Sequence, residues 1–371
     1  MYLVGPGRSR SSFYSGLVRE FMFKSCDSDF VNSASEATPA GHKPRPRIAL
    51  LSNPKSTGNI AQLPRIREFC AEHPDIFHYE VEHADQIGQA MVAIARVRPK
   101  VLVVNGGDGT VQAALTELYN GDHFGAERPP VAVLPSGKTN LIALDLGARG
   151  DPVKALEQLI ELAQHDLSPY IVAREMIALR HGSSEEDSAS RPVIGMFLGG
   201  AGLADTMLYC RDKIYPLGLP NGIAHGITAF ALLAKLFLKV KANFLPPDPR
   251  PLNVSLRQEE NTISGRFSLL AVTTLEKLLL SSDVGGKGEG TLKLLAIEER
   301  PMSLIRGLAA SIAGKLGRTS LPGVHYQHAH EIRIEGESSS VILDGETFHA
   351  EQGQPIFLRP ARPLSFVRLA A

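Results

Sequence analysis

The sequence of 371 residues has no tryptophan, only three cysteines, and no excess of charge of either sign. The cysteines, Cys26, Cys70 and Cys210, are odd in number and lie far apart in the chain. This pattern excludes a disulfide scaffold or a zinc module and favours a reducing compartment. Lysine plus arginine equals aspartate plus glutamate at 39 each, which argues against a nucleic-acid-binding protein, because such a protein normally carries a basic excess.

Long apolar runs and a secretory signal are also lacking. The longest uncharged stretch, 214–234, contains Pro216, Pro220 and His225, so it does not read as one membrane-spanning helix. Met1 is followed by a polar stretch instead of the apolar segment of a signal peptide. We therefore expect a soluble, cytoplasmic protein, and we leave open a peripheral contact with the inner face of the plasma membrane.

Strand and helix patterns divide the chain into three predicted parts. Residues 1–46 lack sustained periodicity and read as a flexible tail. Residues 47–168 alternate short apolar runs with helical segments, and the continuous Val/Leu runs indicate strands buried on both faces. We therefore predict an α/β domain with a parallel sheet. Its expected strands are 47–51, 77–81, 100–104 and 131–134, and its expected helices are 63–72, 87–96 and 111–118.

Residues 169–371 change character and predict a mainly antiparallel, sandwich-like β domain, with its last strands free to pack back on the first domain. The expected strands are 171–179, 192–198, 252–256, 267–273, 292–296, 331–334, 341–343 and 347–350. One long helix, 224–240, is expected to interrupt this half, and 181–191 and 245–251 read as exposed loops.

The strongest functional signal is the glycine-rich loop, which we define as Gly106-Gly107-Asp108-Gly109-Thr110. It follows a very apolar strand and leads into a helix. Three glycines let backbone N–H groups approach a bound anion closely, and the positive end of the following helix points to the same place. Asp108 would repel a phosphate unless a cation is present, so a Mg²⁺–nucleotide is the natural ligand. The plainer interpretation is a glycine-rich turn in which Asp108 caps the helix.

Three further segments accompany this loop in a fixed order. The first loop is Asn53-Pro54-Lys55-Ser56-Thr57-Gly58-Asn59, the third loop is Leu134-Pro135-Ser136-Gly137-Lys138-Thr139-Asn140, continued by Asp145-Leu146-Gly147, and the acidic turn is Asp344-Gly345-Glu346. With Gly199-Gly200-Ala201-Gly202, they resemble the segments of the diacylglycerol kinase catalytic-domain family. The resemblance is closest to bacterial lipid kinases, extends to sphingosine kinases and NAD kinases, and spans about 47–369.

The resemblance implies a kinase that uses ATP and Mg²⁺. It implies a nucleotide site formed by Asn53, Lys55, Ser56, Gly106, Gly107, Gly109, Thr110, Gly137, Lys138, Thr139 and Asn140. It implies Asp108 in the metal–phosphate network and Glu346 as the acceptor of a proton from the attacking hydroxyl. Asp344 is either the partner of Glu346 or a link to the Mg²⁺ shell, and the sequence does not order these two roles. Taken alone, Asp344-Gly345 is also a plain hairpin turn with solvated acids.

Some positions depart from the family pattern. Gln112-Ala113 stand where the family usually has Asn-Glu, and Glu82-His83 stand where it often has Thr-Thr. Lys138 takes the position of a nucleotide-binding threonine, and a lysine there can contact phosphate as a point charge. The sequence thus predicts a rearranged set of nucleotide contacts.

Three basic or imidazole-rich regions have weaker signals. His325, His328 and His330 fall within six residues, and His328 and His330 are expected on one face of a strand. An exposed edge explains them better than a metal pair, because no acid or cysteine completes the spacing. The apolar segment 211–241 carries a local charge of about +4, which fits either a core helix with a basic face or contact with an anionic bilayer. Residues 300–318 read as a second basic surface or as a loop.

The favoured function is transfer of the γ-phosphate of ATP to a hydroxyl of a lipid at the membrane surface, with a diacylglycerol-like or sphingoid acceptor. The sequence does not identify the acceptor, and it leaves a homodimer open. One alternative is a kinase of a soluble acceptor such as NAD. Another is a nucleotide- or lipid-binding protein without catalysis, which Gln112-Ala113 and Lys138 would favour.

Overall fold

The computed structural model describes residues 48–137, 140–182, 191–214, 247–256, 262–275, 290–337 and 339–369, all within one compact unit. The predicted tail at 1–46 and the predicted helix at 224–240 lie outside these residues. Within the ranges just given, no helix is both long and apolar enough to cross a membrane.

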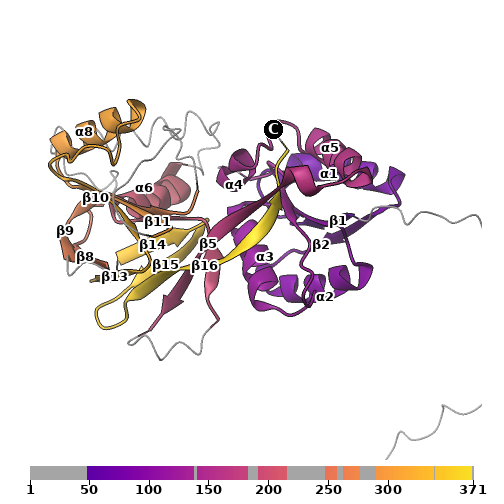
Figure 1. Ribbon diagram of the computed structural model, residues 1–371, viewed down its shortest axis with the longest axis horizontal. Coiled ribbons are helices and arrows are strands. Elements are labelled where there is room, and N and C mark those ends of the chain that lie inside the picture. The colour runs from indigo at the N-terminus through magenta and orange to yellow at the C-terminus, as the bar shows by residue number, and fades with distance from the viewer. Residues whose placement is uncertain are drawn as a thin grey trace, which may run out of the picture. The chain divides into compact units, whose positions relative to one another are not determined.

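The described strands form two sheets (Figure 1). The ten-stranded sheet contains β1 (Ile48–Ser52), β2 (Ile76–Glu80), β3 (Val101–Asn105), β4 (Val131–Val133), β5 (Ile171–His181), β6 (Val193–Gly195), β8 (Leu252–Leu256), β9 (Thr262–Gly265), β13 (Ile332–Gly336) and β16 (Ile356–Val367). The six-stranded sheet contains β7 (Phe197–Gly200), β10 (Phe267–Thr273), β11 (Leu292–Glu298), β12 (Val324–Ala329), β14 (Ser339–Leu343) and β15 (Glu346–Ala350).

The described helices surround these sheets. They are α1 (Asn59–Glu72), α2 (Ile87–Val97), α3 (Asp108–Asn120), α4 (Leu141–Asp145), α5 (Pro152–Gln164), α6 (Gly202–Tyr209) and α8 (Pro301–Ile312). Shorter turns of helix are η1 (Ala84–Gln86), η2 (Ser168–Tyr170) and the π-helical η3 (Cys210–Ile214).

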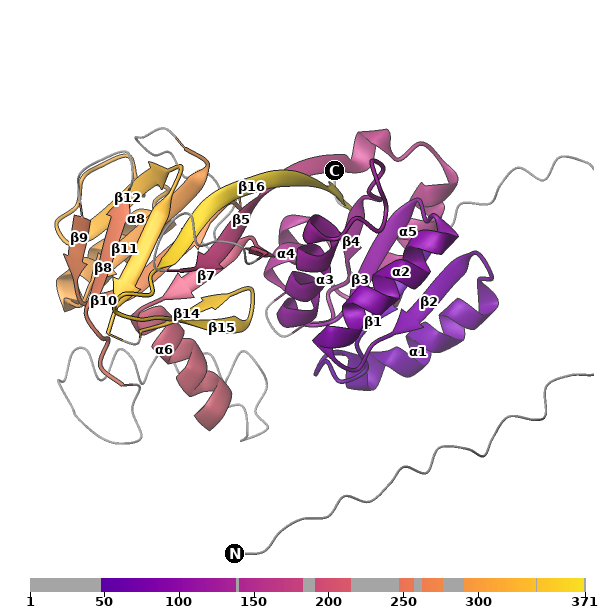
Figure 2. The same cartoon turned by 90° about the horizontal axis from the view of Figure 1, so that it is seen from below.

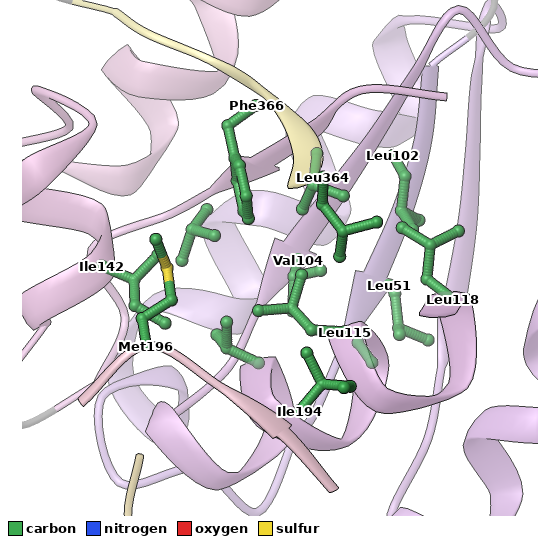
Figure 3. Close-up of a cluster of buried hydrophobic side chains, with 14 of the residues drawn as sticks. Leu51, Leu102, Val104, Leu115, Leu118, Ile142, Ile194, Met196, Leu364 and Phe366 are labelled. Atoms are coloured by element: carbon green, nitrogen blue, oxygen red, sulfur yellow. The ribbon is translucent and has the colours of Figure 1, made fainter. Parts of the chain in front are cut away.

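The N-terminal part is the predicted α/β domain, with parallel strands in the order β2-β1-β3-β4. Alternate residues of the fully buried β1 face opposite layers. Ala49 and Leu51 pack with α2 and α3, whereas Ile48 and Leu50 pack with α1 and α5. Figure 3 shows the first of these layers, with Leu115 and Leu118 of α3 beside the strands. Burial on both faces explains why these strands read as unbroken apolar runs.

The order of these strands creates a switch point, because β1 lies between β2 and β3. The chain leaves β1 toward one side of the sheet to form β2 and later returns on the other side to form β3. Ligands of open α/β sheets bind beside the carboxyl ends of strands at such a point. The first loop follows β1 and the glycine-rich loop follows β3, so both predicted loops lie at this position.

The C-terminal part is the predicted antiparallel sandwich. Apolar side chains of the ten-stranded sheet, such as Val254, Ile332 and Leu358, pack in one core with side chains of the six-stranded sheet, such as Leu270 and Leu294. The predicted fold class is therefore confirmed.

The long strand β16 joins the two parts of the large sheet. It pairs antiparallel with β5 along most of its length and meets β4 in parallel at Phe366 and Val131 (Figure 2). The sequence did not reveal this strand, because Pro360 and Pro363 interrupt its pattern. The register with β5 shifts between Ala361 and Leu364, which accommodates Pro363. The predicted boundary at 168 falls just before β5 and stays a prediction.

Two predictions for this half are wrong. The segment 192–198 is not one strand, because it divides at Met196 into β6, in the large sheet, and β7, in the small one. The prediction of one long helix in this half missed α6 and α8. The segment 300–318 therefore begins with a helix: Pro301 occupies its first turn and Gly314, with a φ of 62°, follows its end.

Candidate active site

The glycine-rich loop connects the buried strand β3 to α3. Gly107 precedes the helix with an extended backbone, and α3 begins with Asp108 and without a side-chain cap. Its first N–H groups are therefore available to an anion, and the helix dipole favours negative charge there. A Cβ on Gly106 would lie 2.7 Å from the Cβ of Thr110, so the loop needs glycine at this position.

The first loop is bonded to both other loops. The side chain of Asn53 donates to Oγ1 of Thr110 at 2.9 Å, and its Oδ1 accepts from the N–H of Lys55 at 2.9 Å. Ser56 Oγ donates to the carbonyl oxygen of Ser136 at 3.3 Å. These bonds fix the first loop against the glycine-rich loop and the third loop.

A network of buried polar side chains holds the backbone of the first loop and the end of β3. Asn59 donates from Nδ2 to the carbonyl oxygens of Asn53 at 2.8 Å and Asn105 at 2.9 Å. Asn105 in turn donates from Nδ2 to Oγ of Ser52 at 3.0 Å, and Ser52, Asn59 and Asn105 are fully buried. The sequence analysis missed this support. The available signal was a polar residue directly after each apolar strand, at the edge where sites of parallel sheets form.

The third loop packs directly on the glycine-rich loop. A Cβ on Gly137 would lie 3.2 Å from Cα of Gly107, so only glycine allows this approach without displacement. Asn140 adopts a left-handed conformation with φ 53°, and its Oδ1 accepts from the N–H of Gly137 at 2.6 Å. Lys138 and Thr139 lie outside the described residues, so their predicted nucleotide contacts stay a prediction.

The acidic turn is a two-residue hairpin between β14 and β15. Asp344 and Gly345 have positive φ values of 41° and 93°, and Leu343 pairs with Glu346. This is the geometry that Asp-Gly predicts for a tight hairpin. The two acids differ, however, because Asp344 is 7% exposed whereas Glu346 is exposed to solvent.

Asp344 is held by the bend between β6 and β7. Its Oδ2 accepts from the N–H of Met196 at 2.6 Å, and its Oδ1 accepts from the N–H of Phe197 at 3.0 Å. Burial is the main cause that raises the pKa of Asp344 to about 7, and the charge of Asp108 raises it further, although the two backbone bonds act in the opposite direction. Asp344 thus links the acidic turn, the β6–β7 bend and Asp108.

The acidic turn lies against the N-terminus of α3. A Cβ on Gly345 would be 3.3 Å from the backbone nitrogen of Gly109 and 3.4 Å from Cβ of Asp108. A Cβ on Gly109 would overlap Oε1 of Glu346 and lie 3.4 Å from its Cδ. Two glycines, one in the first turn of α3 and one in the β14–β15 hairpin, therefore permit the contact that brings Glu346 to the glycine-rich loop.

These elements enclose a pocket of about 440 Å³. It is lined by Asn53, Lys55, Ser56, Thr57, Val81, Glu82, His83, Ala84, Ile87, Gly107, Asp108, Gly109, Thr110, Gly345 and Glu346. Lys55 Nζ lies 3.1 Å from Oε2 of Glu82 and 3.0 Å from Nε2 of His83. Glu82 and His83, which replace Thr-Thr of the family pattern, therefore hold the lysine of the first loop within the pocket. Gln112 is buried and does not line it.

Two neighbouring carboxylates, Asp108 in the pocket wall and Asp344 buried beside the pocket, suit a hard divalent cation. Asp108 and Asp344 are close enough for the charge of one to raise the pKa of the other, and a cation beside them would relieve this repulsion. Across the described part of the chain, no group of three or more His, Cys, Asp or Glu side chains converges into a complete metal site. Mg²⁺ held by Asp108 and Asp344 would therefore complete its shell with phosphate oxygens and water, as is usual for this ion.

Other sequence candidates lie away from this pocket. His325 contacts Glu298 at 3.3 Å and His328 contacts the carbonyl oxygen of Gly290 at 3.2 Å. His330 does not share a strand face with His328, because β12 ends at Ala329. The apolar stretch within 211–241 lies mostly outside the described residues.

Comparison with known proteins agrees with these segments. Residues 47–170 match the family model "Diacylglycerol kinase catalytic domain". A crystal structure of a putative diacylglycerol kinase from Bacillus anthracis str. Sterne superposes with a TM-score of 0.57 at 17% identity, covering 87% of this chain and 96% of that chain. A second structure, of a diacylglycerol kinase from the same organism, gives a TM-score of 0.52 at 16% identity, with coverage of 87% and 96%. These two likenesses show the fold. No curated protein matches the chain.

The structural likeness covers both parts of the fold, and the family model covers the part that carries the first three loops. The resemblance predicted from the sequence segments is therefore confirmed for residues 47–170, which match the diacylglycerol kinase catalytic domain.

Proposed function

We propose that this protein is a lipid kinase that transfers the γ-phosphate of ATP, in the presence of Mg²⁺, to a hydroxyl of a lipid at a membrane surface. The observation that carries the proposal is the contact between the acidic turn and the glycine-rich loop. Glu346 comes from the β14–β15 hairpin, whereas Asp108 and Gly109 begin α3, and the two segments line one pocket. A phosphate donor and a proton acceptor can therefore face each other across a single site.

The loops would bind the phosphates. The N-terminus of α3 offers N–H groups and the positive end of the helix dipole, and Asn53 keeps Thr110 oriented. Lys55 stands in the pocket wall, where its ammonium can approach a phosphate once it leaves Glu82. Bound at Asp108 and Asp344, Mg²⁺ would neutralise charge that develops on the phosphate oxygens.

Glu346 would act on the acceptor. Its carboxylate accepts the proton of the lipid hydroxyl as the hydroxyl oxygen forms a bond to the γ-phosphorus. The bond between that phosphorus and the bridging oxygen breaks, and ADP leaves with the electron pair. Glu346 suits this role because it is exposed in the pocket, whereas Asp344 has both carboxylate oxygens bonded to backbone N–H groups. We therefore propose Glu346 as the proton acceptor and Asp344 as the residue that positions the turn.

The test is phosphate transfer from ATP labelled at the γ-position to a total lipid extract, with NAD as a matched soluble acceptor. The proposal expects label in one chloroform-soluble species and none in NAD. Label in NAD alone would favour a kinase of a soluble acceptor. ATP binding in a calorimetric titration without transfer to any lipid would favour a binding protein without catalysis.

A further inference from the structure

Helix α8 exposes four large apolar side chains to solvent, whereas a helix that only covers a core would bury them. Met302, Ile305, Leu308 and Ile312 are 57%, 46%, 50% and 67% exposed. They make up four of the eight exposed large hydrophobic side chains found among the described residues. Their spacing places them within roughly a third of the helix circumference. We call this set the α8 apolar face.

The opposite side of α8 is built from small residues. Ser303, Gly307 and Ala310 are buried there. A Cβ on Gly307 would lie 2.6 Å from Cδ1 of Ile297, so the helix backbone sits directly on β11. An ordinary surface helix buries its large apolar residues and exposes polar ones. Because α8 does the reverse, its exposed face is suited to a partner outside the described chain.

The charges around α8 indicate the kind of partner. Residues 300–318 contain four basic side chains, Arg300, Arg306, Lys315 and Arg318, and no acidic one. Arg306 is exposed beside the apolar face, and Lys315 and Arg318 are exposed just after the helix. A second copy of the same face would bring like charges together, whereas an anionic bilayer offers both apolar and negative groups.

Backbone hydrogen bonds close the C-terminal end of α8. The N–H of Lys315 donates to the carbonyl oxygen of Ala310 at 2.8 Å, and the N–H of Gly314 donates to that of Ser311 at 3.1 Å. Gly314 has a φ of 62°, which completes a Schellman motif. The backbone of Lys315 is therefore fixed three residues after Ile312, the last member of the α8 apolar face.

We propose that α8 docks this protein on an anionic lipid bilayer, with the α8 apolar face in the acyl–headgroup boundary and the basic residues toward the headgroups. The proposal rests on the proposed function, since a kinase of a lipid must reach the bilayer. The proposal places the membrane contact on α8, which the structure describes, whereas the sequence suggested the segment 211–241.

The lack of tryptophan gives a direct test. In Leu308→Trp the new indole is the only one in the chain, so its emission reports on α8 alone. With phosphatidylglycerol-containing vesicles and no ATP, we expect a blue shift, and with pure phosphatidylcholine vesicles a much smaller one. The matched control is Val92→Trp, at an exposed apolar position of α2, whose emission should not change. Unchanged emission of the Leu308→Trp protein with anionic vesicles would overturn the proposal.

Further variants separate the docking surface from catalysis. Ile305→Gln/Ile312→Gln should abolish sedimentation with anionic vesicles, whereas Val92→Gln/Leu144→Gln should retain it. Arg306→Gln/Lys315→Gln should weaken vesicle binding by roughly thirtyfold, since each basic residue near an anionic surface contributes about fivefold.

The two proposals fail in different ways. If docking is wrong but the kinase proposal is right, the Ile305→Gln/Ile312→Gln protein phosphorylates vesicle-bound lipid as fast as the wild type. If only the kinase proposal is wrong, the wild type binds anionic vesicles and transfers no phosphate, even to a short-chain dispersed lipid. A third outcome is that the wild type forms a dimer that does not bind vesicles and that Ile305→Gln/Ile312→Gln converts it to a monomer. This outcome would assign α8 to self-association and overturn the docking proposal.

Discussion

Replacement of Gly109 by alanine should separate stability from activity. Gly109 is the second residue of α3, and its helical backbone accepts alanine without strain. A Cβ there overlaps Oε1 of Glu346, the flexible end of a side chain, and lies 3.4 Å from Cδ. The Glu346 carboxylate must therefore withdraw by roughly 1 Å, and a displacement of that size in a reacting group lowers turnover about a hundredfold.

The same substitution should not weaken the fold. Gly→Ala at a compatible helical position raises the free energy of unfolding by about 0.4–1 kcal/mol, chiefly because the unfolded chain loses conformational entropy. We therefore expect Gly109→Ala to unfold at the same or a higher urea concentration than the wild type. Its kcat for phosphate transfer should fall about a hundredfold, with the Kd for ATP nearly unchanged.

Gly88 provides a matched control, because it is the second residue of α2. A Cβ on Gly88 would lie 3.6 Å from Oε1 of Glu117, which is ordinary van der Waals contact. Gly88→Ala should therefore gain similar stability and keep full turnover. Full turnover in Gly109→Ala would refute the reasoning that Glu346 works from its position beside Gly109.

Three other perturbations test the surroundings of the pocket. The pKa of Asp344, about 7 in the folded protein, lies above its ordinary value, so the folded state retains a proton that the unfolded state releases. In divalent-free buffer, urea denaturation should show stability falling by as much as about 4 kcal/mol as pH rises from about 4 to about 7, and Asp344→Asn should flatten this slope. Glu82→Gln should free Lys55 and raise ATP affinity by less than about fivefold in calorimetry, since exposed ion pairs contribute about 1 kcal/mol or less. Arg174→Met should cost about 3–5 kcal/mol in thermal or urea unfolding because it leaves the buried carboxylate of Asp145 unpaired, and adding Asp145→Asn should restore much of the loss.

The sequence was sufficient where local chemistry decides the structure. The strand before the glycine-rich loop reads clearly because it is buried on both faces, and its glycines predict the anion-binding turn. The Asp-Gly pair likewise predicts the tight hairpin at 344–346. Helix α5 was not predicted, although Asp151 caps it and Pro152 begins it. The sequence therefore contains a start signal for this helix.

The features that the sequence did not predict depend on contacts between segments that are distant in the chain. The division of 192–198 at Met196 creates the two N–H donors for Asp344, yet nothing in those residues shows that one half pairs with β5 and the other with β10. The position of β16 between the two parts of the large sheet is likewise determined by tertiary packing. The inverted polarity of α8 becomes visible only when burial is known, because its apolar residues have ordinary helical spacing.

The most direct test of the central claim compares the wild type with Glu346→Gln in transfer of labelled phosphate from ATP to lipid. The account predicts that the wild type labels a lipid and that the variant does so at least about a hundredfold more slowly, with the Kd for ATP within about twofold of the wild type. Equal rates in the two proteins would contradict the assignment of Glu346 as the proton acceptor and, with it, the proposed active site.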